Sequence, residues 1–219
     1  IAAQLAADAE RAGATAINTA LPRAFASSPG SLLDYARAVC DRVSLPVIVQ
    51  DWNPAGASVG VDFVTALRTA CPNFRYLKLE EPGIGPLVRE ILSATGRQVG
   101  VFSGWGGLHL LELAPAGIVG LMPGLALADV FVRMWRDLEQ GAWAEAYERF
   151  AGVSPFIQFS LQTFEQFHHA EKRLLAARGI LSSGTVRPVT VELNPDAGRY
   201  LDRLIACLLP ALPLSVQRH

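Results

Sequence analysis

The sequence predicts an α/β fold in which helices cover a parallel sheet. Two observations predict it. Short, nearly continuous apolar runs alternate with segments of helical apolar spacing, and such runs are typical of strands covered on both faces by helices. The chain of 219 residues is also 51% hydrophobic and 18% charged, a composition that suits a folded domain with a sizeable core.

The first half of the chain alternates helix and strand in regular order. Gly13 follows the opening helix, as glycine often does just past a helix C-terminus, and Ser31 is the predicted N-cap of the next one. The predicted helices are 1–12, 31–43, 61–70, 86–95 and 108–113. The predicted strands are 14–18, 46–50, 74–79, 98–103 and 116–122.

After the last of these strands the pattern changes to helices alone. The predicted helices are 128–139, 142–150, 156–178 and 195–209, separated by Gly141, by Gly152 with Pro155, and by the stretch 182–188. We therefore expect two regions, residues 1–137 with the sheet and residues 138–219 as a C-terminal helical extension.

The spacing of the strands favours a barrel. Successive strands begin roughly 20 to 30 residues apart, which is the period of a (β/α)8 TIM barrel. A doubly wound open sheet is the alternative, but its phosphate-binding glycine signature is incomplete, because Gly83 and Gly85 lack the third glycine. Five strands cannot close such a barrel. We predict its last five strand–helix units, with roughly three units, about 80 residues, preceding Ile1.

Composition excludes several classes of partner. The formal net charge is −1 and no basic stripe is present, so a nucleic-acid partner is not expected. No uninterrupted apolar run reaches the roughly 18 residues of a membrane-spanning helix, so we expect a soluble, cytoplasmic protein. The three cysteines, Cys40, Cys71 and Cys207, have no metal-ligand spacing, and we expect neither a metal nor another cofactor.

Lys78 is the first candidate for chemistry. It is one of only two lysines, with Lys172, among 19 basic residues. Barrel enzymes carry their active sites at the carboxyl ends of the strands, where Lys78 stands. Strand alternation puts it on one face with Tyr76 and Glu80, opposite two leucines. A lysine withdrawn from water there is more readily neutral and can attack a carbonyl to form an imine.

At this point the chain resembles the dihydrodipicolinate synthase and N-acetylneuraminate lyase family, barrel enzymes that form a Schiff base with pyruvate and other 2-oxo acids. The resemblance runs from the first helix to about Leu193 and rests on the order and spacing of several short motifs. These are Tyr76-Leu77-Lys78-Leu79-Glu80, Val101-Phe102-Ser103-Gly104, Gly117-Ile118-Val119-Gly120, Arg178-Gly179-Ile180 and Val186-Arg187-Pro188.

The resemblance implies roles for particular residues. Lys78 stands where the family has its imine-forming lysine, Gly104 where it has a glycine after the seventh strand, and Val119 where a backbone carbonyl faces the site. Ser103, at the same strand end as Gly104, is a further substrate-binding candidate. The family resemblance also implies a homo-oligomer, a dimer or tetramer.

Two positions depart from the family pattern. Asp51 stands in Asp51-Trp52-Asn53-Pro54, where the family usually has a proton-relaying tyrosine. The carboxylate can serve as general acid and base, or it can cap the following turn. Arg23 stands in Pro22-Arg23-Ala24, where many members have Pro-Tyr-Tyr, and can hold a substrate carboxylate through a bidentate fork or lie solvated at the surface.

These observations predict a metal-independent class I aldolase, lyase or dehydratase acting on a 2-oxo acid such as pyruvate or a sugar-acid derivative. Lys78 would form the imine, Asp51 would carry protons, and Arg23, Ser103, Gly104 and Val119 would contact substrate. Two alternatives stay open. One is a relative that has lost catalysis and binds a ligand or partner. The other is a phosphate-binding barrel enzyme of another reaction type.

Overall fold

The computed structural model describes every residue except 25, 54–55, 189–190 and 213–219. The chain divides into two compact units. The first comprises Ile1–Trp105 with His109–Met122, and the second comprises Gly106–Leu108 with the residues from Pro123 onward. The boundary predicted at residue 137 marks the end of the barrel repeats, whereas these two units are defined by their packing. It therefore stays a prediction.

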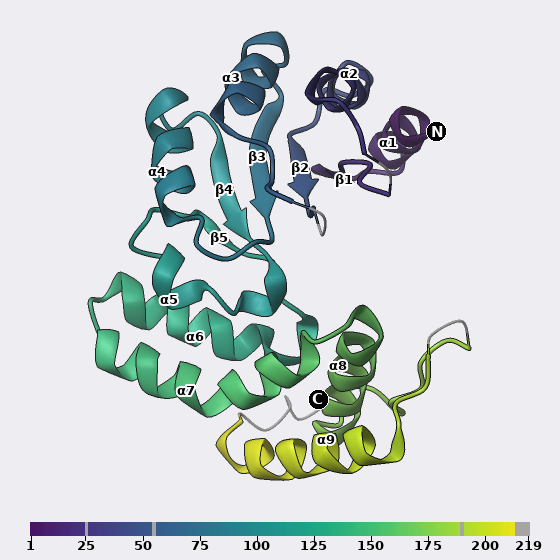
Figure 1. The fold of residues 1–219 in the computed structure, drawn as a ribbon, viewed down its shortest axis with the longest axis vertical. Helices are drawn as coiled ribbons and strands as arrows, with labels where there is room; N and C mark the ends of the chain where they lie inside the picture. The colour runs from purple at the N-terminus through teal and green to yellow at the C-terminus, as the bar shows by residue number, and fades with distance from the viewer. Residues whose placement is uncertain (25, 54–55, 189–190, 213–219) are drawn as a thin grey trace. The chain divides into compact units, whose positions relative to one another are not determined.

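The first unit contains five parallel strands in the order β1-β2-β3-β4-β5, each strand pairing with the next along the chain. Its helices form an arc outside the strands (Figure 1). The strands are β1 Ile17–Ala20, β2 Val47–Asp51, β3 Phe74–Leu79, β4 Gly100–Ser103 and β5 Gly120–Leu121. The helices are α1 Ala2–Arg11, α2 Pro29–Cys40, α3 Val61–Ala70, α4 Gly85–Ala94 and α5 Leu110–Leu113.

The predicted parallel α/β arrangement is confirmed, and the differences lie at element ends. The predicted N-cap Ser31 is wrong, because Ser28 has the extended cap conformation and its hydroxyl accepts the amide of Ser31. The strand predicted at 116–122 is only two residues long. Gly117, at φ 96°, lies in the turn that follows α5, where its amide donates to the Ala114 carbonyl. The pairing of β5 with β4 therefore starts later than predicted.

The two faces of the sheet differ in what they carry. Val47, Val49, Leu77 and Leu79 are buried on the face that α3 and α4 cover. Residues of the opposite phase, Tyr76 among them, are only partly buried. This agrees with the predicted alternation, in which the leucines meet the outer helices and Lys78 faces the other way.

The second unit is helical, with α6 and α7 running side by side (Figure 1). The helices are η2 Leu125–Leu127, α6 Ala128–Glu139, α7 Trp143–Ser160, α8 Phe164–Ala177 and α9 Pro195–Leu208. The break predicted at Gly152 with Pro155 is wrong, because α7 runs through both. The chain instead turns before Thr163, whose extended backbone and side-chain bond to the Gln166 amide start a new helix.

Arg178, from one of the resemblance motifs, joins the end of α8 to the start of α6. Its guanidinium donates to both carboxylate oxygens of Asp129, at 2.9 and 2.6 Å, and to the carbonyl of Ala126. The hydrogen bonds from Arg178 hold the pKa of Asp129 below its usual value of 3.8. This motif therefore has a structural role in the second unit.

We expect Asp129→Asn to lower the free energy of unfolding by about 1 kcal/mol at pH 7, since the carboxylate is partly exposed and solvent screens the pair. The folded-state pKa is depressed, so the stabilisation is fully present above pH 3.8 and is lost as the pH falls through the folded value. Urea unfolding of both proteins between pH 3 and 7 measures this. A difference that persists unchanged to pH 3 would contradict it, and exposed Glu192→Gln is the control.

Within the part of the chain that the structure describes, no helix is both long enough and apolar enough to cross a bilayer.

Candidate active site

Lys78 and Glu80 form an ion pair at the carboxyl end of β3. The Lys78 Nζ lies 2.7 Å from Glu80 Oε1, and the two side chains are only 13% and 9% exposed. The strand register places Lys78 beside Gln50 of β2 and Phe102 of β4, on the face that the outer helices do not cover. An amine and a carboxylate thus meet at the strand ends, where barrel enzymes carry their chemistry.

Two further groups hold the Glu80 carboxylate, and a third orients one of them. Gln50 Nε2 donates to Oε1 at 2.8 Å, and the backbone amide of Trp105 donates to Oε2. Asn18 Nδ2 in turn donates to Gln50 Oε1 at 3.2 Å. Trp105 adopts a positive φ of 45°, a strained conformation for a residue with a side chain. Glu80 is therefore fixed by contacts from β2, β3 and the turn after β4, and Asn18 of β1 supports the β2 contact.

Two indole rings lie near these strand ends. Trp52 follows β2 and Trp105 follows β4, and their ring centroids are 6.5 Å apart with planes inclined by 24°. Because β3 lies between those two strands, the stacked rings bridge the strands on either side of Lys78. They supply an apolar border to this edge of the sheet.

Gly104 provides the space that Glu80 occupies. A Cβ atom at this position would stand only 2.0 Å from Glu80 Oε2 and 2.3 Å from Cδ. Its amide donates to the Leu79 carbonyl at 2.8 Å, which fixes its backbone next to β3. Gly104 therefore acts in this structure through Glu80, and its predicted contact with substrate stays a prediction.

We expect Gly104→Ala to displace the Glu80 carboxylate from Lys78 and from the Trp105 amide, and to lower the free energy of unfolding by about 1–3 kcal/mol, the usual cost of leaving a buried polar group without its partner. Urea unfolding measures the loss. Gly152→Ala is a matched control, because it lies in α7 with open space around it. That change should stabilise by up to about 1 kcal/mol through helix propensity. Equal stability of Gly104→Ala and the unaltered protein would contradict the view that Gly104 makes room for the Glu80 carboxylate.

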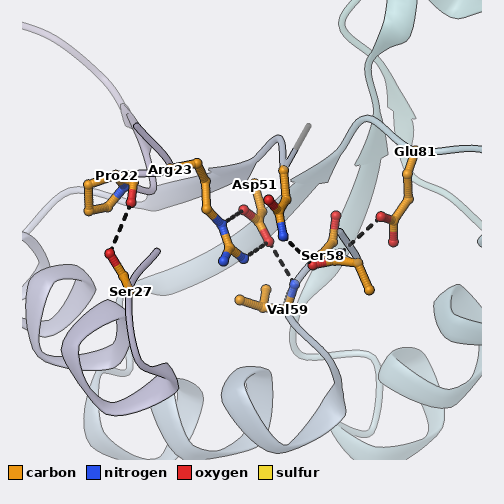
Figure 2. Close-up of polar contacts among 9 residues, drawn as sticks. Pro22, Arg23, Ser27, Asp51, Ser58, Val59 and Glu81 are labelled. Carbon is orange, nitrogen blue, oxygen red and sulfur yellow. Dashed lines mark hydrogen bonds and ion pairs between the residues drawn. The ribbon is translucent and has the colours of Figure 1, made fainter. Parts of the chain in front are cut away.

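Asp51 and Arg23 pair with each other rather than with Lys78 (Figure 2). Arg23 Nε and Nη2 donate to the two Asp51 oxygens at 2.7 and 2.6 Å, and the Val59 amide donates to Oδ2 at 2.6 Å. The hydrogen bonds that Arg23 donates to the Asp51 carboxylate raise the pKa of Arg23. Asp51 is fully buried and opposite Leu79, so it lies on the helix-covered face.

The Asp51 contacts hold the loop that follows β2. Val59 ends this loop, and the neighbouring Ser58 amide donates to Glu81 Oε2 at 2.9 Å. These contacts fit the alternative in which Asp51 caps the turn, although Pro54 of that turn lies outside the described residues. The proton-carrying role of Asp51 and the substrate-binding role of Arg23 are left as predictions.

A pocket of about 510 Å³ lies beside this loop, on the helix side of the sheet. Arg23, Val59 and the first residues of α3 line it, together with Pro29 and Leu32 of α2, while Lys78 is not among its lining residues. The side chain that was predicted to bind a substrate carboxylate therefore faces a pocket on the opposite face of the sheet from the predicted nucleophile.

Ser103 and Val119 complete the predicted set. Ser103 is buried and pairs with Leu79, so it shares the helix-covered face with Asp51. Val119 directly precedes β5, its amide donates to the Val101 carbonyl at 2.9 Å, and its side chain is 46% exposed. Among the hydrogen bonds and ion pairs of the described residues, none joins Ser103 or Val119 to Lys78, and their substrate-binding roles stay predictions.

Glu80 and Gln50 are not in the predicted set, yet Glu80 contacts the Lys78 amine, and Gln50, the neighbour of Lys78 in the strand register, bonds Glu80. Both stand at strand ends in the phase of Lys78, and this phase is the signal that identifies them. Among the described residues, no group of three or more His, Cys, Asp and Glu side chains is arranged to hold a metal ion.

Comparison with known proteins assigns the chain to a family. The model of the dihydrodipicolinate synthetase family matches residues 1–207. The chain belongs to this family. A curated relative is the L-2-keto-3-deoxyarabonate dehydratase of Azospirillum brasilense, 27% identical over 179 residues, which are 78% of this chain and 57% of the dehydratase. The chain thus spans little more than half the length of this relative.

Solved structures of the dihydrodipicolinate synthetase family share the fold. The dihydrodipicolinate synthase of Rhodopseudomonas palustris superposes with a TM-score of 0.82 at 22% identity, over 94% of this chain and 70% of the synthase. YagE of E. coli K12, solved in complex with pyruvate, gives 0.81 at 21% identity over the same shares. At these identities the likeness shows the fold alone, and it identifies the parallel sheet as part of a TIM barrel.

Proposed function

We propose that this protein is a Schiff-base-forming lyase, a class I aldolase or dehydratase, acting on a 2-oxo acid. The observation that carries the proposal is the Lys78 amine in contact with the Glu80 carboxylate, at the carboxyl end of a barrel strand and on the uncovered face. A lysine nucleophile with a base within reach is the pairing that imine formation requires.

The imine explains how such a site would break bonds without a metal. Condensation of Lys78 with the 2-oxo carbon releases water and leaves a protonated imine. This cation accepts the electron pair from an adjacent C–H or C–C bond, giving an enamine. The enamine can then expel a hydroxyl group from the next carbon, which is a dehydration, or add to an aldehyde, which is an aldol reaction.

The relatives support a 2-oxo acid as the substrate class. The curated relative is named for dehydration of a 2-keto-3-deoxy sugar acid, and one structural relative was solved with pyruvate. We therefore propose pyruvate or a sugar-acid derivative as the substrate of this protein. A dimer or tetramer in the cytoplasm, expected from the family resemblance, belongs to the same proposal, and light scattering of the native protein would test the assembly.

The proposal is tested by incubating the native protein with pyruvate and with a panel of longer 2-oxo acids, each with borohydride. A reduced imine should add the mass of the substrate less one oxygen to the intact protein. Absence of any adduct across the panel would favour the relative that has lost catalysis. Protection from proteolysis by phosphorylated ligands, again without an adduct, would favour the phosphate-binding enzyme.

A further inference from the structure

The ion pair at the end of β3 bears on how the Lys78 amine loses its proton. A carboxylate beside an ammonium group stabilises its charged form, and an ammonium group is not a nucleophile. Lys78 must therefore lose a proton before it attacks a carbonyl. The group that receives this proton has to lie within hydrogen-bond distance of Nζ, and Glu80 Oε1 lies at 2.7 Å.

We propose that Glu80 is the proton-transfer residue for Lys78 and that Gln50, oriented by Asn18, is the positioning residue that keeps Glu80 in reach. This inference rests on the proposed function, because it concerns how the imine forms. It assigns to Glu80 the proton handling that the sequence pattern predicts for Asp51.

The contacts distinguish Glu80 from Asp51. Both oxygens of Asp51 are taken by Arg23 and the Val59 amide, on the face that the helices cover. Glu80 shares the face of Lys78 and touches its reacting nitrogen. Glu80 Oε2 is held by the Trp105 amide, whereas Oε1 is shared between Lys78 and Gln50. One carboxylate oxygen is thus anchored and the other is directed at the amine.

The proton balance of imine formation closes with Glu80 alone. It takes a proton from the Lys78 ammonium, and the neutral amine attacks the 2-oxo carbon. Glu80 then returns this proton to the carbonyl oxygen, giving the carbinolamine hydroxyl. It next takes a second proton from the nitrogen and gives it to this hydroxyl, which leaves as water. The products are the protonated imine, water and the Glu80 carboxylate, so no other reactant is consumed.

Gln50 supports these proton transfers through the orientation of its side-chain amide. Its Nε2 donates to Glu80 while its Oε1 accepts from Asn18 Nδ2, so the Asn18 contact fixes which end of the amide faces the carboxylate. A donor at this distance stabilises the ionised carboxylate and limits its rotation. These three side chains come from adjacent parallel strands, which gives the row a rigid support.

The test measures how fast the native protein and its variants form the borohydride-trapped imine between pH 5 and 9. The substrate is pyruvate, or the 2-oxo acid of the panel that is trapped fastest. Glu80→Gln keeps an acceptor for the Trp105 amide but removes the base, so trapping should slow by about 100-fold or more. Glu81→Gln, which alters the neighbouring carboxylate on the Ser58 amide, is the control and should leave the rate unchanged.

Two further variants separate proton transfer from a merely structural role. Glu80→Ala opens space for a small carboxylate, so added formate should restore part of the trapping rate. Gln50→Leu leaves Glu80 in place but unsupported, so the rate should fall about 10-fold and respond less to formate. An unaltered protein that forms no adduct would overturn the proposed function itself. The role of Glu80 would be overturned if the unaltered protein forms the trapped imine and Glu80→Gln forms it equally fast. It would also be overturned if formate does not speed imine trapping in Glu80→Ala.

Discussion

Replacing Lys78 with arginine is expected to abolish imine trapping and to reduce turnover of a 2-oxo acid by about 10⁴-fold or more. Arginine keeps the positive charge beside Glu80, but its guanidinium does not deprotonate to a nucleophile. The loss should therefore come from chemistry rather than from broken packing. Steady-state turnover and intact-mass analysis after borohydride treatment measure both effects.

The chain offers a matched control for this variant, because it has only one other lysine. Lys172 lies in the second unit, where its Nζ donates to the Thr185 carbonyl at 3.0 Å. Lys172→Arg should trap the imine and turn over substrate at the unaltered rate. Trapping that survives in Lys78→Arg but disappears in Lys172→Arg would remove Lys78 from the mechanism.

Replacing Asp51 with asparagine is expected to lower the free energy of unfolding by about 2–3 kcal/mol. Breaking a buried ion pair from one side typically costs about 3–5 kcal/mol, and the partial exposure of Arg23 reduces this cost. Imine formation should survive, because the contacts of Asp51 lie on the other face of the sheet. Urea unfolding and the trapping rate, measured on the same preparation, separate the two effects.

Asp34→Asn is the control for this substitution, since Asp34 is exposed on α2. A stable Asp51→Asn protein with greatly reduced turnover would restore the alternative in which Asp51 carries protons in place of the family tyrosine. Unchanged turnover with reduced stability would leave Asp51 as the residue that holds the loop after β2.

The alternating elements were predictable from local signals, whereas only some of their ends were. The helix at Val61–Ala70 and the strand at Phe74–Leu79 have the predicted limits, because their apolar period is clear over their whole length. The helix break predicted from Gly152 and Pro155 was wrong, because α7 continues through both residues. The helix tolerates one missing amide bond there because two long flanking segments pack against α6 and α9.

The candidate site was partly predictable for a similar reason. Strand phase placed Lys78 on the uncovered face, because the alternating leucines mark the opposite one. The partners of Lys78 depend on tertiary geometry instead. The pairing of Glu80 with Gln50 requires the register of β2 against β3, and the pairing of Asp51 with Arg23 joins residues 28 positions apart. A single sequence gives neither register nor such long-range contacts.

The most direct measurement is to locate the reduced adduct by peptide mapping after the native protein has been treated with a 2-oxo acid and borohydride. We expect the added mass on the peptide that contains Lys78, with the peptide of Lys172 and the N-terminal amine unmodified. Attachment to Lys172 or to the N-terminus, with Lys78 unmodified, would contradict it.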